Sequence, residues 1–188
     1  MNIRQMQYRT KTYIAADWTE DRDLIDALYS WNENENLSLH FVNVHDLTDS
    51  DDGSLNCSIK KNLRLRMNVS KTFVLIVGKK TKSLRSGACY KCAHYSAGNI
   101  LIDIKPSCTK GFTVNNQSYV DYECSMALRD YNAGDLKNII VIYNGLTEPD
   151  KSLCPDVLKN VGVHIGSDII IDGEHKWAYG RIKEAICK

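Results

Sequence analysis

The sequence predicts an α/β protein with a flavodoxin-like, doubly wound parallel sheet of about five strands. Two unbroken apolar runs, residues 72–78 and 138–143, have the composition of strands that are buried on both faces. Stretches with a helical period separate these runs from weaker strand candidates. The chain has 188 residues and 43% hydrophobic residues, enough for one compact domain with a full-sized core. We therefore predict a single domain over residues 1–188.

The first half of the chain supplies two strands and two helices to this prediction. Residues 12–16 form a short apolar run that ends at Asp17, and acidic residues after Thr19 indicate a helix start. The Asn-rich residues 32–36 end that helix, and a second strand is expected over residues 37–44. An acidic loop, residues 46–53, comes next. A second amphipathic helix then follows, with Leu55, Ile59, Leu63 and Met67 on its apolar face and Lys60, Lys61 and Arg64 on its solvent face.

The second half repeats the alternation after an interruption. Residues 84–117 separate the third strand from the next helix by far more than the usual few residues, so we expect an insertion with a hairpin over residues 99–104. A helix is predicted from Ser118 to about Asp130, a weaker fifth strand over residues 168–171, and a final helix from about residue 174 to residue 186.

Composition narrows the classes of function. The net charge of +1 creates no global field that would recruit nucleic acid or a membrane surface, and no apolar run has the length needed to cross a bilayer. The seven cysteines are an odd number and unevenly spread, which is typical of reduced thiols rather than a disulfide framework. We therefore expect a cytoplasmic protein with no nucleic-acid or membrane partner.

Glu123 is the most unusual acidic residue of the predicted helices. Ser118, with Asp121 three residues later, resembles a capping box and sets the start of its helix. The residues three and four positions away on the helix are Tyr119, Val120, Met126 and Ala127, and none is a cation. This carboxylate is therefore expected to be partly desolvated, which raises its proton affinity and suits it to acid–base or charge-stabilising chemistry. The alternative is a boundary glutamate whose carboxylate reaches water.

Several polar segments are expected to meet Glu123 at one edge of the sheet. In doubly wound sheets, ligands bind outside the carboxyl ends of the strands. Asp17, Trp18 and Thr19 follow the first strand, the acidic loop 46–53 follows the second, and the basic segment 79–83 follows the third. The chain has no glycine-rich phosphate-binding loop and no Ser-His-Asp or Cys-His arrangement, and its five histidines are scattered.

The insertion carries a possible metal site. Cys89 and Cys92 form a Cys-x-x-Cys pair, His94 follows, and Cys108 lies further along. Three thiolates and an imidazole would complete a tetrahedral zinc site. The spacing from His94 to Cys108 matches no standard zinc finger. Reduced structural thiols and a redox-sensitive pair therefore stay as alternatives, and reduced thiols without metal are the favoured interpretation.

The order of these features resembles the TIR domains. Shared features are the polar loop after the first strand, the acidic loop after the second, the apolar third strand, and a helix with an aromatic residue four positions before a glutamate. That pair is Tyr119 and Glu123 here, in Ser118-Tyr119-Val120-Asp121-Tyr122-Glu123-Cys124. The chain is similar to the bacterial TIR-like family that includes Thoeris anti-phage proteins, over residues 12–143 at least. Tyr119 stands where the common family pattern has a tryptophan.

The resemblance implies a flavodoxin-like fold and a role in signal transduction. Some members cleave NAD at the nicotinamide–ribose bond, so NAD would be a substrate rather than a bound cofactor, and Glu123 would be the catalytic carboxylate. Asp17, Trp18, Thr19, Ser83 and Tyr119 are the expected substrate-binding residues. The resemblance also implies self-association or an effector partner. The alternatives are a non-catalytic interaction module and, less favoured, a flavodoxin-like FMN protein, because the loop after the first strand is acidic where a flavin phosphate needs donors.

Overall fold

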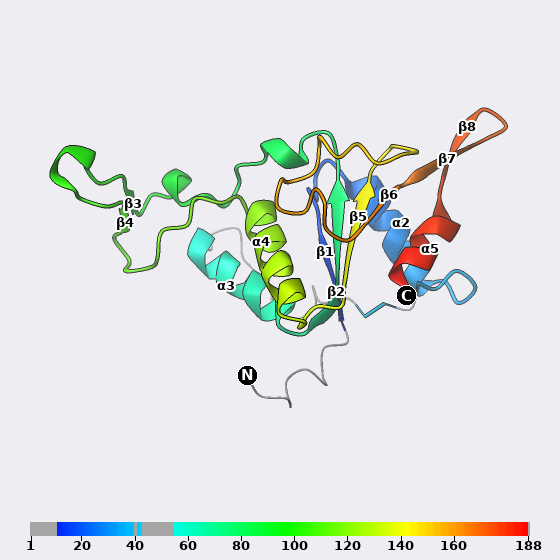
Figure 1. The fold of residues 1–188 in the computed structure, drawn as a ribbon, viewed down its shortest axis with the longest axis horizontal. Helices are drawn as coiled ribbons and strands as arrows, with labels where there is room; N and C mark the ends of the chain where they lie inside the picture. The colour runs from blue at the N-terminus through cyan, green and yellow to red at the C-terminus, as the bar shows by residue number, and fades with distance from the viewer. Residues whose placement is uncertain (1–10, 40, 43–54, 188) are drawn as a thin grey trace.

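A four-stranded parallel sheet forms the centre of the molecule (Figure 1). The computed structural model describes residues 11–39, 41, 42 and 55–187. The strand order is β1-β2-β5-β6, and each strand is parallel to its neighbours. The strands are β1 (Lys11–Ala15), β2 (Ser70–Val77), β5 (Asn138–Tyr143) and β6 (Val163–Gly166). The first, third and fourth predicted strands correspond to β1, β2 and β5.

Helices cover both faces of this sheet, which confirms the predicted doubly wound α/β class. On one face, α3 (Asn56–Met67) and α4 (Tyr119–Asn132) pack against Phe73, Leu75 and Val77 of β2. On the other face, α2 (Arg22–Glu33) and α5 (Tyr179–Ile186) pack against Val74 and Ile76 of the same strand. Successive strand residues point to opposite faces, so burial of both faces explains the unbroken apolar run of β2.

The second predicted strand, residues 37–44, is not a strand where it is described. Residues 37–39, 41 and 42 are irregular, and the other residues of the prediction lie outside the described ones. The Thr12 N–H donates to the Val42 carbonyl at 2.8 Å, so the segment runs beside β1. The Asn32 side-chain amide bonds both the N–H and the carbonyl of Phe41, at 3.0 Å each. These side-chain bonds hold Phe41 beside the last turn of α2.

The C-terminal predictions are wrong in detail. Residues 168–171 do form a strand, β7 (Asp168–Ile171), but it pairs antiparallel with β8 (Glu174–Trp177) in a separate hairpin and does not join the main sheet. The fourth strand of the main sheet is β6, which the sequence analysis missed. The final helix begins at Tyr179 rather than near residue 174. In Figure 1 the β7–β8 hairpin extends away from the sheet beyond α5.

The insertion forms an arm that projects from the sheet (Figure 1). The short helix η2 (Thr81–Ser83) precedes the insertion. An antiparallel bridge between Asn99 and Ile104 confirms the predicted hairpin at its tip. Its short elements are η3 (Cys89–Lys91), β3 (Tyr95–Ser96), η4 (Ile100–Ile102) and β4 (Ser107–Cys108).

Lys60 on α3 attaches the stem of this arm, and the prediction that it faces solvent is wrong. Its side chain is only 4% exposed. Its ammonium group donates to the Asn115 carbonyl, the Asn115 side-chain oxygen and the Gln117 carbonyl, at 2.7–3.1 Å. An ammonium group has three donors, so these bonds offset its desolvation. The ends of the insertion are thereby tied to α3, immediately before α4 begins.

Candidate functional site

Helix α4 begins as the sequence predicts, and this places Glu123 inside the protein. Ser118 is the N-cap residue, and its hydroxyl oxygen accepts a bond from the Asp121 N–H at 3.0 Å. The helix packs on the face of the sheet that carries Tyr13 of β1 and Phe73 of β2, and this contact buries its second turn. Glu123 is 6% exposed, whereas an unpaired glutamate is usually at the surface.

Glu123 meets a buried tyrosine from a distant strand. The Tyr13 hydroxyl, on β1, donates to Glu123 Oε1 at 2.5 Å. Burial raises the pKa of Glu123 to about 7, because it disfavours the charged form. The bond from Tyr13 and the positive charge of Arg66 on α3 both favour the charged form and lower this pKa, but burial outweighs them. The predicted desolvation of Glu123 is therefore confirmed, and the carboxyl group titrates near neutral pH.

A cavity of about 290 Å³ opens beside this carboxyl group. It brings together the carboxyl end of β1, the apolar face of α3 and the first turns of α4. The predicted site residues Asp17, Trp18, Tyr119 and Glu123 all line it. The remaining lining residues are Ala16, Ile59, Leu63, Arg66, Leu84, Ser86 and Val120. We refer to this space as the Glu123 cavity.

Tyr119 is held in the wall of the Glu123 cavity by the first residues of the insertion. Its hydroxyl donates to Asn56 Oδ1 at 2.9 Å, and its backbone N–H donates to the Ser86 carbonyl at 2.8 Å. Gly87 has a φ of +91°, and a Cβ there would lie 2.5 Å from the Tyr119 ring. Only glycine fits this backbone conformation and this contact without strain. The insertion therefore builds one wall of the cavity.

Asp17 and Trp18 form the outer part of the Glu123 cavity. Asp17 Oδ1 accepts bonds from the backbone N–H groups of Thr19 and Glu20, at 3.1 and 3.3 Å, which fixes the turn after β1. The Trp18 ring is 44% exposed and stacks on Tyr29 of α2, with ring centroids 6.4 Å apart. An exposed indole at the mouth of a cavity offers a surface for a flat ring.

Two predicted site residues lie outside the Glu123 cavity. The Thr19 side chain is exposed and does not line it. Ser83 is also exposed, and its hydroxyl donates to the Lys80 carbonyl instead of reaching the cavity. Ser86, three residues later, lines the cavity in its place.

Sequence reasoning missed Tyr13 and Arg66. Tyr13 lies in the middle of an apolar strand, where a buried tyrosine resembles any other core aromatic. The signal that was available is its polar hydroxyl, since a buried tyrosine usually finds a hydrogen-bond partner. Arg66 lies on the opposite side of α3 from Lys61, close to the end of the helix, and nothing local marks it as facing a carboxylate.

The four residues considered as a possible zinc site do not assemble into one in this structure. Among the described residues, no group of three or more His, Cys, Asp or Glu side chains is arranged to hold a metal ion. Cys89 Sγ accepts a bond from the Asn115 N–H, and Cys92 Sγ accepts one from the His94 N–H. The His94 ring meets Thr109 Oγ1 at 3.3 Å. Cys108 pairs with Tyr95 across the β3–β4 ladder. All seven cysteines, each in the described part of the chain, are free thiols.

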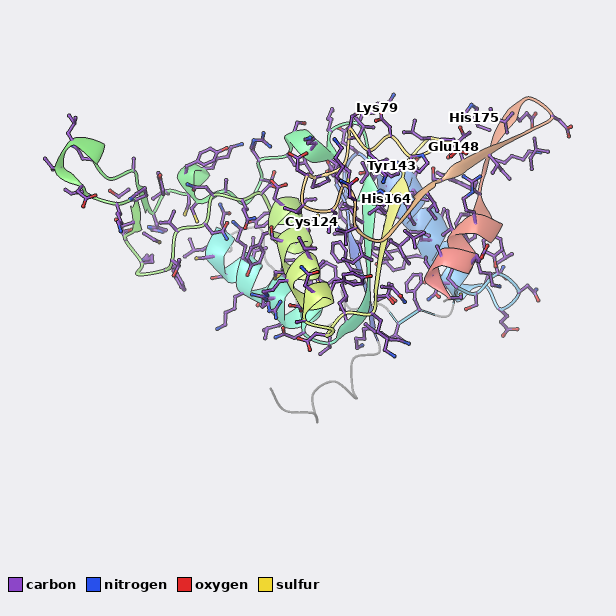
Figure 2. All side chains as sticks on the ribbon, viewed as in Figure 1. Lys79, Cys124, Tyr143, Glu148, His164 and His175 are labelled. Carbon is purple, nitrogen blue, oxygen red and sulfur yellow. The ribbon has the colours of Figure 1, made fainter. Side chains whose placement is uncertain are left out.

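The histidines remain apart from the Glu123 cavity where they are described. Figure 2 shows His164 next to Tyr143 near the top of the sheet, and the Tyr143 hydroxyl lies 2.8 Å from His164 Nδ1. His164 Nε2 faces the carbonyls of Leu158 and Val161. Burial lowers the pKa of His164, because it disfavours the charged ring. His175 contacts Asp168 within the separate hairpin region. His164 is therefore a structural residue that joins β5, β6 and the loop between them.

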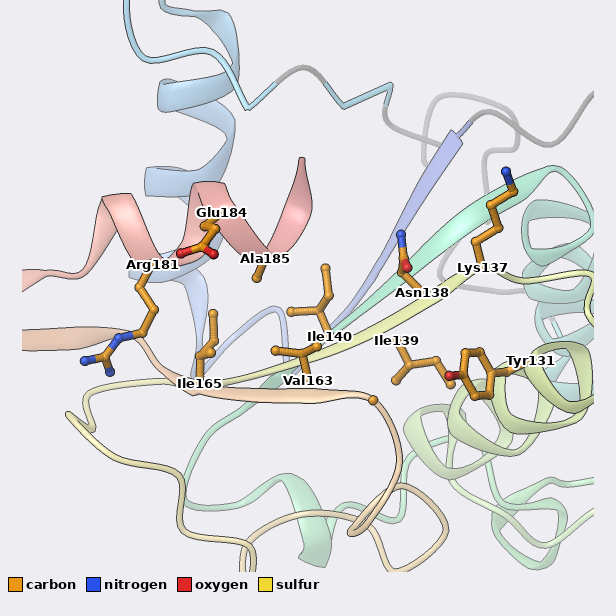
Figure 3. A pocket seen from close by; sticks show the side chains of 11 residues that line it. Tyr131, Lys137, Asn138, Ile139, Ile140, Val163, Ile165, Arg181, Glu184 and Ala185 are labelled. Atoms are coloured by element: carbon orange, nitrogen blue, oxygen red, sulfur yellow. The ribbon is translucent and has the colours of Figure 1, made fainter. Parts of the chain in front are cut away.

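A larger cavity, of about 430 Å³, lies near the amino ends of β5 and β6 (Figure 3). Its floor is aliphatic, with Ile140, Val163 and Ile165, while Arg181 and Glu184 from α5 border it. Lys137, Arg181 and Glu184 are all exposed. We call it the β6 cavity. It contains none of the residues that the sequence analysis selected.

The parallel sheet with helices on both faces is consistent with a flavodoxin-like or TIR-like fold. Residues 13–86, less than half of the chain, match the family model described as Thoeris protein ThsB, TIR-like domain, so this segment is similar to the Thoeris-type TIR-like family. The matched segment begins within β1, contains α2, α3 and β2, and ends before Tyr119 and Glu123. It supports a TIR-like signalling protein of the Thoeris anti-phage type. No curated protein matches the chain. Among the described residues, no helix has both the length and the apolar character that a membrane crossing requires.

Proposed function

We propose that this protein cleaves NAD at the bond between nicotinamide and ribose and releases an ADP-ribose-derived signal in anti-phage defence. The observation that carries the proposal is the buried Glu123 carboxyl group, which lies in a cavity at the carboxyl edge of the sheet. This edge is where ligands of doubly wound sheets bind. The match to the Thoeris TIR-like family model supports the same class of function.

The chemistry of Glu123 fits this bond cleavage. When the C–N bond breaks, its electron pair leaves with nicotinamide and positive charge develops on the ribose ring. A carboxylate in a water-poor cavity stabilises that charge more strongly than it would in water. Either water or a hydroxyl group of the same molecule then attacks the ribose carbon, which gives ADP-ribose or a cyclised product. Glu123 must be ionised for this role, and its pKa of about 7 leaves a large ionised fraction at neutral pH.

The size of the Glu123 cavity limits which part of NAD it holds. A volume of about 290 Å³ is at the lower end of the range for small-molecule sites. We infer that the nicotinamide–ribose end enters between Tyr119 and Glu123, while the adenosine end extends past the exposed Trp18 ring. Arg66 on α3 lines the same cavity and faces Glu123. In this arrangement it would be the cation that binds the phosphates of NAD.

Nicotinamide release tests this proposal. NAD is incubated with the wild-type chain and with Glu123→Gln, and free nicotinamide is measured by chromatography. We expect release by the wild type and at least a hundredfold loss in Glu123→Gln, since one electrostatic stabiliser typically contributes that much. Glu20→Gln and Glu33→Gln, which alter acids outside the cavity, serve as matched controls and should retain the rate. Equal rates for wild type and Glu123→Gln would exclude the catalytic role.

We further propose that the active site is completed by self-association or by an effector partner. The acidic loop 46–53, which the sequence analysis placed beside the site, lies outside the described residues. Specific activity should rise with protein concentration if a second copy completes the site, because only the associated fraction is then competent. A constant specific activity over a hundredfold dilution would show that one chain suffices.

A non-catalytic interaction module is the second candidate function, and the arm carries the observation that favours it. Leu101, Ile102 and Ile104 at its tip are 94%, 64% and 53% exposed. Clustered apolar side chains at the end of a projecting arm are typical of a protein contact. A wild-type chain that releases no nicotinamide at any concentration would favour this candidate.

A further inference from the structure

A second cavity lies between α3 and the insertion and has the chemistry of a ligand site. Its volume is about 440 Å³. Helix α3 contributes Lys60, Lys61 and Arg64, the irregular segment that leads from the insertion to α4 contributes Phe112 and Asn115, and α4 contributes Tyr122. It shares no lining residue with the Glu123 cavity. We call it the α3–insertion cavity.

Its charge comes from an unusual helix. The cations of α3 are Lys60, Lys61, Arg64 and Arg66, and the helix sequence contains no Asp or Glu. An isolated surface helix usually mixes charges, because like charges three or four residues apart repel each other. Arg66 faces Glu123 on the other side of the helix, and the remaining three cations line the α3–insertion cavity. The lining of the cavity therefore includes three cations and no Asp or Glu.

Two of these cations retain donors for a ligand. All three donors of the Lys60 ammonium group bind Asn115 and Gln117 at the stem of the insertion. Arg64 binds both oxygens of Asp130, at 2.9 and 3.1 Å, through Nη1 alone, so the N–H groups on Nε and Nη2 are left over. Lys61 is exposed and, in the described part of the chain, forms no ion pair. Lys61 and the free edge of Arg64 are suited to bind a phosphate group.

An aromatic ring borders the same cations. The Phe112 side chain is 45% exposed, although it is a large apolar group with no polar atom to hydrate. The Tyr122 ring forms another wall and carries the Lys60 ammonium group 5.5 Å from its centroid. An exposed phenylalanine next to cations with donors left over is the arrangement that stacks a base and neutralises its phosphate.

We propose that the α3–insertion cavity binds a nucleoside monophosphate, with the base stacked on Phe112 and the phosphate held by Lys61 and Arg64. Its volume accommodates a ligand of this size. The wall of the same cavity contains Asn115, whose carbonyl and side-chain oxygens both accept bonds from Lys60. Asn115 lies two residues before Gln117, whose carbonyl also binds Lys60. A bound nucleotide therefore contacts the segment that leads into the N-cap of α4.

Calorimetric titration of the full chain tests this site, with AMP, adenosine and inorganic phosphate as separate probes. AMP should bind more tightly than either adenosine or phosphate, because only AMP uses both the ring and the cations. Lys61→Glu should weaken AMP binding at least tenfold, and Phe112→Ala should weaken it about tenfold. Lys79→Glu and Tyr90→Ala are the matched controls, since both residues are exposed and neither lines a described cavity near α3.

The result separates this proposal from NAD cleavage. Glu123→Gln should leave AMP binding unchanged, whether or not it abolishes nicotinamide release. AMP binding that survives Lys61→Glu and Phe112→Ala but is lost in Trp18→Ala would place the nucleotide in the Glu123 cavity and overturn the proposal. The absence of AMP binding at millimolar concentration would overturn it as well. Neither outcome depends on whether the chain cleaves NAD.

Discussion

The Glu123 cavity and the β6 cavity lie at opposite ends of the same sheet, and they differ in how each treats its charged groups. The β6 cavity is the larger, at about 430 Å³ against about 290 Å³. Its charged residues, Arg181 and Glu184 among them, are exposed and keep their hydration. The Glu123 cavity instead contains a carboxyl group that has lost most of its water. A perturbed ionisable group identifies a functional site better than volume does.

The difference is also one of chain topology. The Glu123 cavity is built where β1 ends and α4 begins, and residues 110 positions apart, Tyr13 and Glu123, meet there. The β6 cavity is built from the amino ends of β5 and β6 and the outer surface of α5. In parallel α/β sheets the carboxyl ends carry the loops that can vary without disturbing the core. We therefore expect the chemistry at the carboxyl ends of the strands and structural support at their amino ends.

The largest effect that can test this comparison is the pH dependence of stability. The pKa of Glu123 rises from 4.5 to about 7 in the folded chain, so the fold favours its neutral form. Its stabilising contribution is complete below pH 4.5 and is lost as pH rises through about 7, at a cost of about 3 kcal/mol. Glu123→Gln should therefore be more stable than wild type at pH 8 by up to about 3 kcal/mol and nearly equal at pH 5.

Urea unfolding at pH 5 and pH 8 measures this difference. Glu184→Gln, at the rim of the β6 cavity, is the matched variant, and it should change stability by less than about 0.5 kcal/mol at both values of pH. A Glu123→Gln chain that gains no stability between pH 5 and pH 8 relative to wild type would show that Glu123 is solvated in the folded state.

One glycine beside each cavity gives the next largest effect: Gly87 packs behind Tyr119 of the Glu123 cavity, and Gly162 lines the β6 cavity. Gly87 has a φ of +91° and faces the Tyr119 ring, while Gly162 has a φ of +83° and faces the Ile139 carbonyl, where a Cβ would lie 2.3 Å away. Alanine at either position strains the backbone, and we expect a loss of about 1–3 kcal/mol in both. Only Gly87→Ala should also reduce nicotinamide release per folded molecule, because it displaces Tyr119. Reduced release in Gly162→Ala would mean that the β6 cavity also affects the reaction.

The sequence predicted those parts of the molecule that depend on local pattern. The unbroken apolar runs of β2 and β5, the capped start of α4 and the apolar surroundings of Glu123 all follow from spacing along the chain. The position of Asp17 and Trp18 beside Glu123 followed from the rule that parallel strands share a carboxyl edge. Lys60 was misplaced because its partners, Asn115 and Gln117, come from the insertion, and a helical period cannot show what a distant segment will cover.

The remaining errors have the same origin. β6 is short and half-exposed, with the pattern Val163-His164-Ile165-Gly166, so it carries too few apolar residues to stand out from a loop. β7 looks like a sheet strand from residues 168–171, yet Ile170 and Ile171 are 59% and 42% exposed in a hairpin outside the main sheet. The contact of Tyr13 with Glu123 depends on the pairing of strand and helix in space. Tertiary partners decided each of these cases.

A smaller effect concerns how the Glu123 carboxyl group is tuned. The Tyr13 hydroxyl donates to it and lowers its pKa. Tyr13→Phe removes this bond and should raise the pKa of Glu123 by about one unit, since a bond to a charged group contributes roughly that much. A ¹³C NMR titration of the Glu123 carboxyl carbon measures the pKa directly, without NAD. Tyr143→Phe is the matched control, because Tyr143 is equally buried but bonds His164. An unchanged Glu123 pKa in Tyr13→Phe would contradict the tuning role.

The smallest expected effect belongs to the β6 cavity itself. Arg181 donates to the Thr147 carbonyl at 2.8 Å from an exposed position, and Lys137 is exposed at the other side of the cavity. Exposed charged residues contribute little to stability because water already solvates them, so Arg181→Gln and Lys137→Gln should each change the free energy of unfolding by less than about 0.5 kcal/mol. Nicotinamide release should also stay at the wild-type rate. The two measurements together test the contrast between the cavities. A large loss of nicotinamide release at normal stability would show that the exposed charges of the β6 cavity contribute to function. Burial of a carboxyl group would then not be what distinguishes the active end of this sheet.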